Sequence, residues 1–213
     1  MRNLHTKELV LFIDAGHGGV NAAGEYMTSP INGKKKNFGT YGYHGDGWFY
    51  EGYSNRIFAD LFMQKAVEMG YLCIPVYHPV NDTNLSIRTS LANNAAAQLG
   101  AKSIFISFHS NAFNGTVRGF NVFYHATSTK GKVIAESVGK NCGQYCTAWG
   151  SNSPNPVRTE TFHVLSQTNM PAILLETLFF DNSDDADLLM SSYFREGFCN
   201  ELLKSINSIK DSI

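Results

Sequence analysis

The chain has 213 residues, enough for one domain with a sizeable core. Hydrophobic residues make up 43% of it and charged residues only 16%, which is the composition of a globular protein and not of a disordered one. With 17 Lys and Arg against 18 Asp and Glu, the formal net charge is −1. This balance argues against a general nucleic-acid-binding protein, because such proteins need a basic face.

Residues 1–8 are polar, and no apolar stretch of signal-peptide length follows them. We therefore expect synthesis in the cytoplasm without a signal peptide, and no segment has the length and apolarity of a membrane span. A zinc site built from cysteines usually needs two close pairs, and only one such pair is present here. We expect four free thiols: Cys73, Cys142, Cys146 and Cys199.

The N-terminal part of the chain begins with a strand and continues through a long irregular stretch into a helix. Residues 9–14 form an apolar run that predicts a strand, followed by a glycine-rich turn at 15–19. Residues 20–50 carry no periodic pattern, and an irregular stretch of that length in a domain is usually functional or mobile. Apolar residues at helical spacing predict a helix over 57–69, ended by Gly70.

The next segments repeat the alternation of strand and helix. Residues 72–76 predict a strand, and residues 103–108 predict a buried strand that runs into His109. Between them lies a helix that ends at Gly100, with a row of apolar residues four apart on one face: Ile87, Leu91, Ala95 and Leu99.

The C-terminal half contains further strands and helices. We expect strands at 119–124, 162–165 and 172–176, a helix over 132–149, a loop at 150–156, and one or two helices over 184–210. This alternation predicts an α/β fold with a mainly parallel sheet and helices on both faces. No internal repeat or linker divides the chain, so residues 1–213 are expected to form a single domain.

Four residues with catalytic potential stand at the predicted carboxyl ends of strands or at the exit of the glycine-rich segment: His17, Glu51, His109 and Glu176. Ligands of open α/β sheets bind at that edge. Two histidines and one carboxylate with an open position form a catalytic zinc set, and a second carboxylate can deprotonate a water molecule.

Simpler roles remain open for these carboxylates. Glu51 precedes a helix, where it can complement the helix dipole. Glu176 ends an apolar strand, and a carboxylate buried there needs a partner. The His-x-x-Glu motif of zinc carboxypeptidases is absent, since Gly18, Gly19 and Val20 follow His17. No His-Glu-x-x-His motif and no Gly-x-Ser-x-Gly elbow occur either.

Six blocks of sequence form an ordered series between about residue 9 and residue 207. The blocks are residues 13–19, Glu51 with Asn55, Arg88 with residues 91–93, residues 107–112, residues 119–124, and residues 171–176 with 179–182. In this order they resemble the motifs of the zinc-dependent N-acetylmuramoyl-L-alanine amidases, peptidoglycan hydrolases of the third amidase type. Each block alone is modest, but six in order are specific.

The resemblance implies a twisted, mostly parallel sheet of about six strands. It implies cleavage of the amide between the lactyl group of N-acetylmuramic acid and the L-alanine of the stem peptide. Carried over by position, His17, Glu51 and His109 would bind one Zn²⁺, and Glu176 would be the general base that later protonates the leaving amine. A catalytically inactive wall-binding module and a zinc carboxypeptidase-like peptidase are the alternatives.

The sequence departs from the family pattern at three places. Ala15 stands where the family usually has proline, and Thr177-Leu178 precedes Phe179 where the family typically has glycine before the phenylalanine. The 20–50 stretch is longer than the family norm, which leaves Glu25 as a rival to Glu51.

Substrate contacts are expected from the aromatic and polar residues near these blocks. Tyr43 and Trp48 lie among glycines just before Glu51 and could contact sugar rings or only fix the loop, and Asn111 could bind substrate or shape its turn. The expected partner is peptidoglycan, and a monomer without a separate cell-wall-binding domain is expected. The polar N-terminus suggests a phage or prophage endolysin that reaches the wall through a membrane lesion. A mother-cell enzyme or an unconventionally exported bacterial enzyme would have the same N-terminus.

Overall fold

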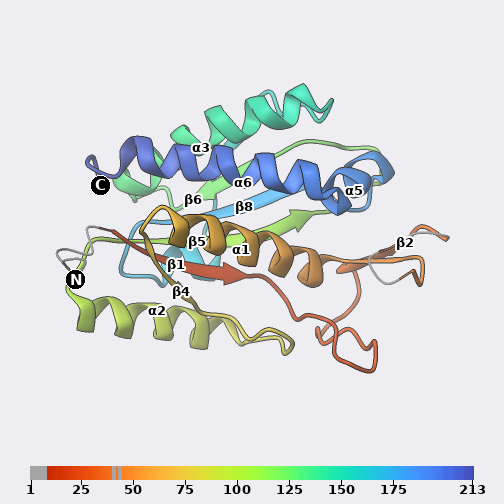
Figure 1. The fold of residues 1–213 in the computed structure, drawn as a ribbon, viewed down its shortest axis with the longest axis horizontal. Helices are drawn as coiled ribbons and strands as arrows, with labels where there is room; N and C mark the ends of the chain where they lie inside the picture. The colour runs from red at the N-terminus through yellow and green to blue at the C-terminus, as the bar shows by residue number, and fades with distance from the viewer. Residues whose placement is uncertain (1–8, 40–41, 43–44) are drawn as a thin grey trace.

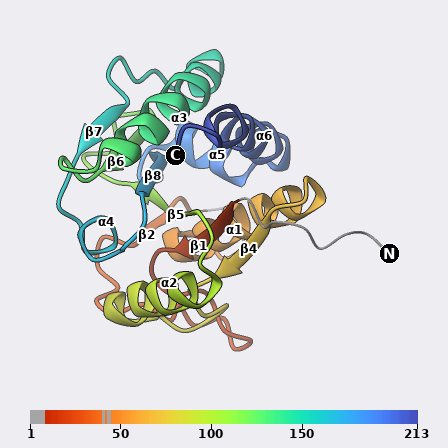
Figure 2. The same ribbon diagram turned by 90° about the vertical axis from the view of Figure 1, so that its left-hand side faces the viewer.

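Six strands form the central sheet, in the order β4-β1-β5-β8-β6-β7 (Figure 1 and Figure 2). The computed structural model describes residues 9–39, 42 and 45–213. All neighbouring strands pair in parallel except β6 and β8, which are antiparallel. This confirms the mostly parallel sheet. The strands are β1 (Val10–Ala15), β4 (Leu72–Pro75), β5 (Ser103–Asn111), β6 (Asn121–Tyr124), β7 (Val157–Thr159) and β8 (Ala172–Phe179).

Helices cover both faces of the sheet, as expected. Figure 2 shows α1, α3 and α6 on one side and α2 and α4 on the other. The bounds are α1 (Glu51–Glu68), α2 (Leu85–Leu99), α3 (Thr129–Ala148), α4 (His163–Ser166), α5 (Ser183–Met190) and α6 (Ser192–Ile209). Within the described residues, no helix is long and apolar enough to cross a membrane.

The alternation of side chains along β1 decides which face carries the polar residues. Leu11 and Ile13 belong to the larger core cluster under α1, α3 and α6, while Val10 and Phe12 belong to the cluster on the α2 side. Because successive side chains point to opposite faces, Asp14 lies on the α2 side.

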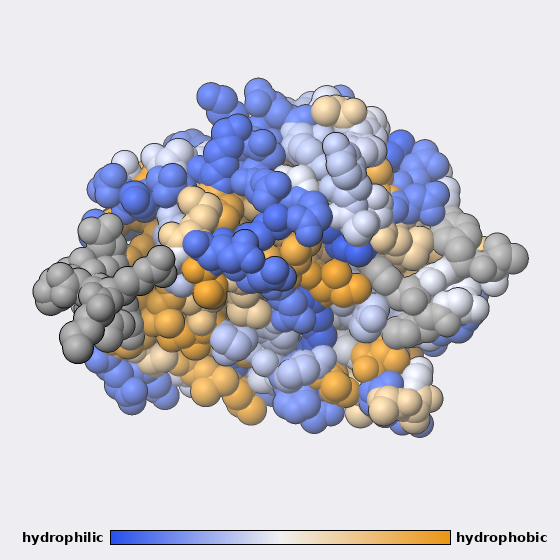
Figure 3. Space-filling model, in the orientation of Figure 1, coloured by the Kyte–Doolittle hydropathy of each residue, from blue (hydrophilic) through white to orange (hydrophobic). Residues whose placement is uncertain are grey.

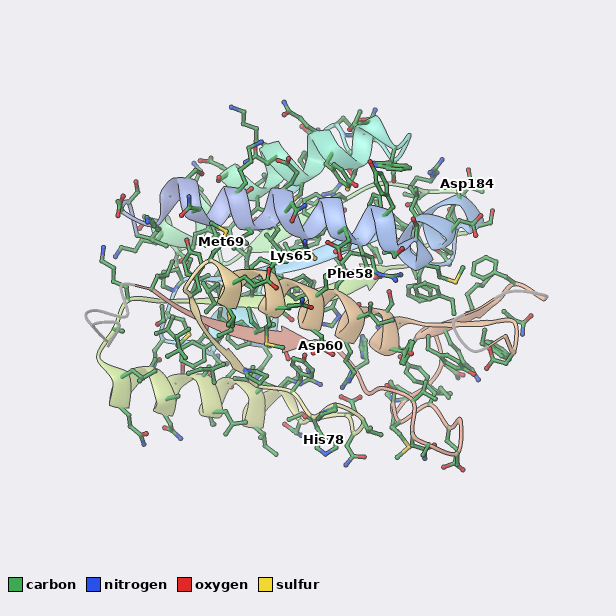
Figure 4. The ribbon with its side chains drawn as sticks, in the orientation of Figure 1. Phe58, Asp60, Lys65, Met69, His78 and Asp184 are labelled. Carbon is green, nitrogen blue, oxygen red and sulfur yellow. The ribbon has the colours of Figure 1, made fainter. Side chains whose placement is uncertain are left out.

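Helix α1 is fixed between the sheet and α6, which sets the position of its first residue, Glu51. Phe58 is buried and meets the ring of Phe198 edge to face at 5.6 Å. Lys65 Nζ lies 2.5 Å from a carboxylate oxygen of Glu196 on α6, and Asp60 accepts a hydrogen bond from the hydroxyl of Tyr77 (Figure 4).

The prediction of a strand at 162–165 is wrong, because His163–Ser166 form the single-turn helix α4. An apolar run this short is compatible with either a strand or a helix. The sixth strand is instead β7, at the edge of the sheet next to the predicted loop. It has three residues, two of them exposed, so it lacks the apolar pattern of a core strand.

The 20–50 stretch contains more structure than its pattern predicts. Strands β2 (Lys35–Asn37) and β3 (Trp48–Tyr50) pair antiparallel in a separate two-stranded sheet that leads directly into α1. A bridge between Val20 and Tyr26 fixes the segment before them. Both strands have only three residues, too few for a periodic signal.

The prediction of which side of α2 faces the sheet is partly wrong. Ile87 and Leu91 are 52% and 51% exposed, while Arg88, Thr89 and Ala92 are buried. The cause is an ion pair between Arg88 and Asp14 of β1, which places this side of the helix against the sheet. Apolar side chains consequently gather on the surface in the region of α2 (Figure 3).

The four cysteines are free thiols, as predicted. Burial raises the pKa of the Cys142, Cys146 and Cys199 thiols above the usual range. These side chains therefore act as small apolar core residues.

Candidate metal centre

Three of the predicted site residues meet at the carboxyl ends of the strands. His17 follows β1, His109 lies near the end of β5, and Glu51 begins α1. One ligand atom from each lies within 4.8 Å of the others. Oε1 of Glu51 is 3.2 Å from His17 Nε2 and 3.2 Å from His109 Nδ1.

Glu25, the rival to Glu51, lies outside this cluster. It is exposed and accepts a hydrogen bond from Asn21. Glu51, in contrast, is only 2% exposed, and its Oε1 also accepts a hydrogen bond from the backbone N–H of Ser110 at 3.4 Å. The start of α1 therefore supplies the carboxylate.

Glycines allow the two histidines to approach the backbone closely. A side chain at Gly16 would place its Cβ 2.0 Å from the ring of His109. A Cβ at Gly52 would lie 2.0 Å from the carbonyl oxygen of Gly18. His17 itself has a φ of 62°, a left-handed conformation that costs an ordinary residue about 1–2 kcal/mol.

Two guanidinium groups hold the carbonyl oxygen of His17 in this conformation. Arg56 Nη2 donates to it at 2.8 Å and Arg88 Nη2 at 3.1 Å. Arg88 also donates to Asp14 Oδ1 at 2.6 Å, and Ser107 donates to the other Asp14 oxygen. The resemblance drew attention to Arg88. Sequence reasoning missed Arg56. The signal that could have identified it is the presence of a charged side chain on the buried face of α1.

The electrostatics of the cluster favour an ionised Glu51. Burial opposes its ionisation, but the hydrogen bonds and charges of His109 and His17 outweigh burial and hold the pKa of Glu51 well below its usual range. Lys34 Nζ, 3.6 Å from Oε2, adds positive charge. Burial lowers the pKa of His17, whereas for His109 the carboxylates of Glu51 and Glu176 outweigh burial and raise the pKa.

Glu176 lies beside the cluster on the neighbouring strand. It pairs in register with His109 on β5 and with Asn121 on β6. Burial raises its pKa from 4.5 to about 7, the nearby charge of His109 opposing this and that of Glu51 adding to it. Its Oε2 is buried and has no hydrogen-bond partner within the part of the chain that the structure describes.

The strand that carries Glu176 bulges just after it. The register shifts between the His109 and Asn111 pairings, with one extra residue on β8. Leu178, fully buried there, has a φ of 63°. This is the position where the family resemblance leads one to expect glycine, and here a leucine adopts the left-handed conformation.

Two cavities flank the cluster. The β7 cavity, of about 600 Å³, is lined by Asn111, Phe123, Tyr124, Val157, Arg158, Thr159, Glu160, Phe162 and Glu176. The second, the His17 cavity, of about 750 Å³, has both histidines of the cluster, Lys34 and Arg88 in its wall.

The three expected substrate residues have different positions. Asn111 lies in the wall of the β7 cavity. Trp48 lies on β3 with Lys35 Nζ 4.1 Å from its ring centroid, and it lines neither of these two cavities. Tyr43 lies outside the described residues.

A His–Glu–His cluster at the carboxyl edge of a mostly parallel sheet, with a second buried carboxylate beside it, is typical of metal-dependent hydrolases. A family model described as N-acetylmuramoyl-L-alanine amidase matches residues 11–208. The chain therefore belongs to the N-acetylmuramoyl-L-alanine amidase family.

Curated relatives agree with this family. The chain is 26% identical to the N-acetylmuramoyl-L-alanine amidase CwlM of Bacillus licheniformis, over 95% of this chain and 70% of that protein. It is 32% identical to the endolysin of Bacillus phage SPP1 over 59% of this chain, and the match spans 46% of the endolysin.

Solved structures share the fold. An N-acetylmuramoyl-L-alanine amidase from Clostridium difficile 630 superposes with a TM-score of 0.76 at 23% identity, covering 97% of this chain and 99% of that one. The catalytic domain of CwlV from Bacillus (Paenibacillus) polymyxa var. colistinus gives a TM-score of 0.70 at 22% identity, covering 95% and 98%.

Proposed function

We propose that this chain is a zinc-dependent peptidoglycan amidase. It cleaves the amide between the lactyl group of N-acetylmuramic acid and the L-alanine of the stem peptide. The observation that carries the proposal is the convergence of His17, Glu51 and His109 within 4.8 Å, with Glu176 on the adjacent strand. Membership of the amidase family supports the choice of bond.

The cluster fits a zinc ion. Two buried polar atoms of the cluster lack a well-directed hydrogen bond among the described residues, which is costly. His17 Nε2 has the 3.2 Å contact with Glu51, and Glu51 Oε2 has the 3.6 Å contact with Lys34. Two imidazoles and one carboxylate are also the donor set of catalytic zinc sites with an open position. His17, Glu51 and His109 would hold the ion, which supplies a Lewis acid for the amide carbonyl and lowers the pKa of a water molecule.

The surrounding residues orient these ligands. The guanidinium groups of Arg56 and Arg88 fix the backbone of His17, while Asn55 Nδ2 donates to the carbonyl of Gly16 at 3.3 Å. Such contacts behind the ligands set ring orientation and metal affinity. The hydrogen bonds and charges of His109 and His17 outweigh burial and keep the Glu51 carboxylate ionised, and therefore able to bind a cation.

Glu176 would move the proton. With a pKa of about 7, its carboxylate can accept a proton from water near neutral pH and can return it to the departing amine. Because Glu176 lies in the wall of the β7 cavity, we expect the leaving group on that side. Asn111 in the same wall, and Tyr43 and Trp48 in the preceding segment, are proposed to contact substrate.

The place of action follows from the substrate. We propose that the protein acts on the cell wall as a monomer and is released to the wall during phage lysis. The similarity to the endolysin of phage SPP1 supports the lytic role. Light scattering of the purified protein tests the oligomeric state, since a dimer would contradict the monomer.

The proposed reaction is tested on purified peptidoglycan digested with zinc-loaded protein, with the product ends identified by mass spectrometry. We expect new L-alanine amino termini, lost on chelation and in Glu176→Gln. Released C-terminal amino acids would identify a carboxypeptidase-like enzyme instead. Bound zinc without cleavage of several wall types would indicate a wall-binding module.

A further inference from the structure

The two cavities differ in their relation to the proton-transfer group. Glu176 lines the β7 cavity, whereas His17 and His109 line the other. A general acid must lie within hydrogen-bond reach of the departing nitrogen. If Glu176 protonates the amine, the peptide half of the substrate extends into the β7 cavity.

This cavity contains one exposed guanidinium group, that of Arg158. Along the part of the chain that the structure describes, Arg158 forms no hydrogen bond or ion pair that would neutralise it. A guanidinium group binds a carboxylate through paired hydrogen bonds more strongly than neutral groups do. N-acetylated glycan strands are uncharged, and the stem peptide is the part of the substrate that carries carboxylates.

The strand register places Arg158 at a useful distance from the reaction. Arg158 pairs with Phe123 on β6, and Phe123 pairs with Leu174 on β8. Glu176 lies two residues further along β8, so it shares the face of Leu174. Two strand spacings and two residue steps separate the Cα atoms of Arg158 and Glu176 by roughly 12 Å.

The separation between Arg158 and Glu176 indicates which carboxylate of the stem peptide Arg158 can reach. An extended peptide advances about 3.3–3.6 Å per residue, and the arginine side chain covers part of the 12 Å. The guanidinium group therefore reaches a group about two residues beyond the scissile bond. In peptidoglycan the residue after L-alanine is D-glutamate linked through its γ-carboxyl group, so its α-carboxylate is either free or amidated.

We propose that Arg158 binds the free α-carboxylate of the second stem-peptide residue and makes the enzyme selective for stems in which this group is not amidated. The proposal rests on the proposed amidase function. Glu160, two residues along the same cavity wall, disfavours a second carboxylate there and limits the selectivity to one anionic group. The rings of Phe123 and Phe162, 5.5 Å apart, form an apolar part of the same wall.

The test compares two disaccharide muropeptides that differ only in a carboxylate or a carboxamide at the second stem residue. Steady-state kinetics are measured for the wild type, Arg158→Gln, Arg158→Lys and Glu160→Gln. Lys130→Gln is the control, since it removes one exposed positive charge on α3 outside both cavities. Calorimetric binding to Glu176→Gln gives a readout without turnover.

We expect the wild type to show a KM about tenfold lower for the acid than for the amide, as the loss of one charge-assisted hydrogen bond predicts. Arg158→Gln should abolish the preference while still cleaving the amide, Arg158→Lys should retain part of it, and Glu160→Gln should retain or increase it. Equal KM values for the wild type, or equal losses on both substrates in Arg158→Gln, overturn the inference. Cleavage of neither substrate overturns the proposed function and the inference with it.

Discussion

The protonation of Glu176 predicts a measurable link between pH and folding in the metal-free protein. Burial raises its pKa from 4.5 to about 7. Below pH 4.5 the folded and unfolded states both hold the proton. Between pH 4.5 and 7 the unfolded chain loses it while the folded protein keeps it, so the free energy of unfolding falls as the pH rises.

The size of this effect follows from the same numbers. The difference between 4.5 and about 7 corresponds to about 3 kcal/mol of lost stability above pH 7, at 1.36 kcal/mol for each pH unit. Glutamine has nearly the shape of a protonated glutamate but never ionises. Glu176→Gln should therefore gain about 3 kcal/mol relative to the wild type between pH 4 and pH 8. In a chain of this size, that gain corresponds to roughly 6–12 °C in Tm.

Urea unfolding of chelated protein at pH 4 and pH 8 measures the difference. Glu136→Gln is the matched control, because Glu136 is exposed on α3 and its ion pair with Lys132 is also exposed, so its substitution should change stability by less than about 1 kcal/mol at either pH. If the free energy of unfolding of Glu176→Gln differs from that of the wild type by the same amount at pH 4 and pH 8, then Glu176 does not keep its proton on folding and the prediction is refuted.

Three further predictions concern residues that support the site. The φ of 63° at Leu178 favours glycine, so Leu178→Gly should be about 1 kcal/mol more stable than Leu178→Ala in calorimetric melting. A higher stability of the alanine variant would contradict backbone strain at this position. Arg88→Met leaves the buried Asp14 carboxylate without its counter-charge, so urea unfolding should show a loss of about 3–5 kcal/mol. A loss below about 1 kcal/mol would refute a stabilising role for this ion pair. Arg56→Lys removes the guanidinium contact to the His17 carbonyl and should weaken zinc binding by roughly 10–100-fold, measured by chelator competition. An unchanged zinc affinity would contradict a positioning role for Arg56.

The sequence predicted the core of the sheet because its central strands are buried on both faces. Residues 103–108 and 172–176 read as continuous apolar runs for that reason. Strands β2, β3 and β7 were missed because each has three residues and lies at an edge or in a separate hairpin. The inner face of α2 was misplaced because a buried ion pair, not apolar periodicity, decides which side of the helix faces the sheet.

The cluster of His17, Glu51 and His109 was predictable because each residue stands where a strand ends or a helix begins, and such positions converge at one edge of a parallel sheet. The supporting contacts were harder to predict. Arg56 donates to backbone carbonyl oxygens, which every residue carries, so its partners leave no pattern in the sequence. The conformation of Leu178 opposes the preference of its own side chain, and only the bulge in β8 shows it.

Hydrolysis of purified peptidoglycan in H₂¹⁸O tests the central claim most directly. If water attacks the lactyl carbonyl, mass spectrometry should find one ¹⁸O atom in the lactyl carboxylate of the glycan product and an unlabelled peptide with a free L-alanine amino terminus. Label at a reducing sugar end or at a peptide carboxyl terminus would contradict the assignment of the bond, and with it the account of the site as an amidase.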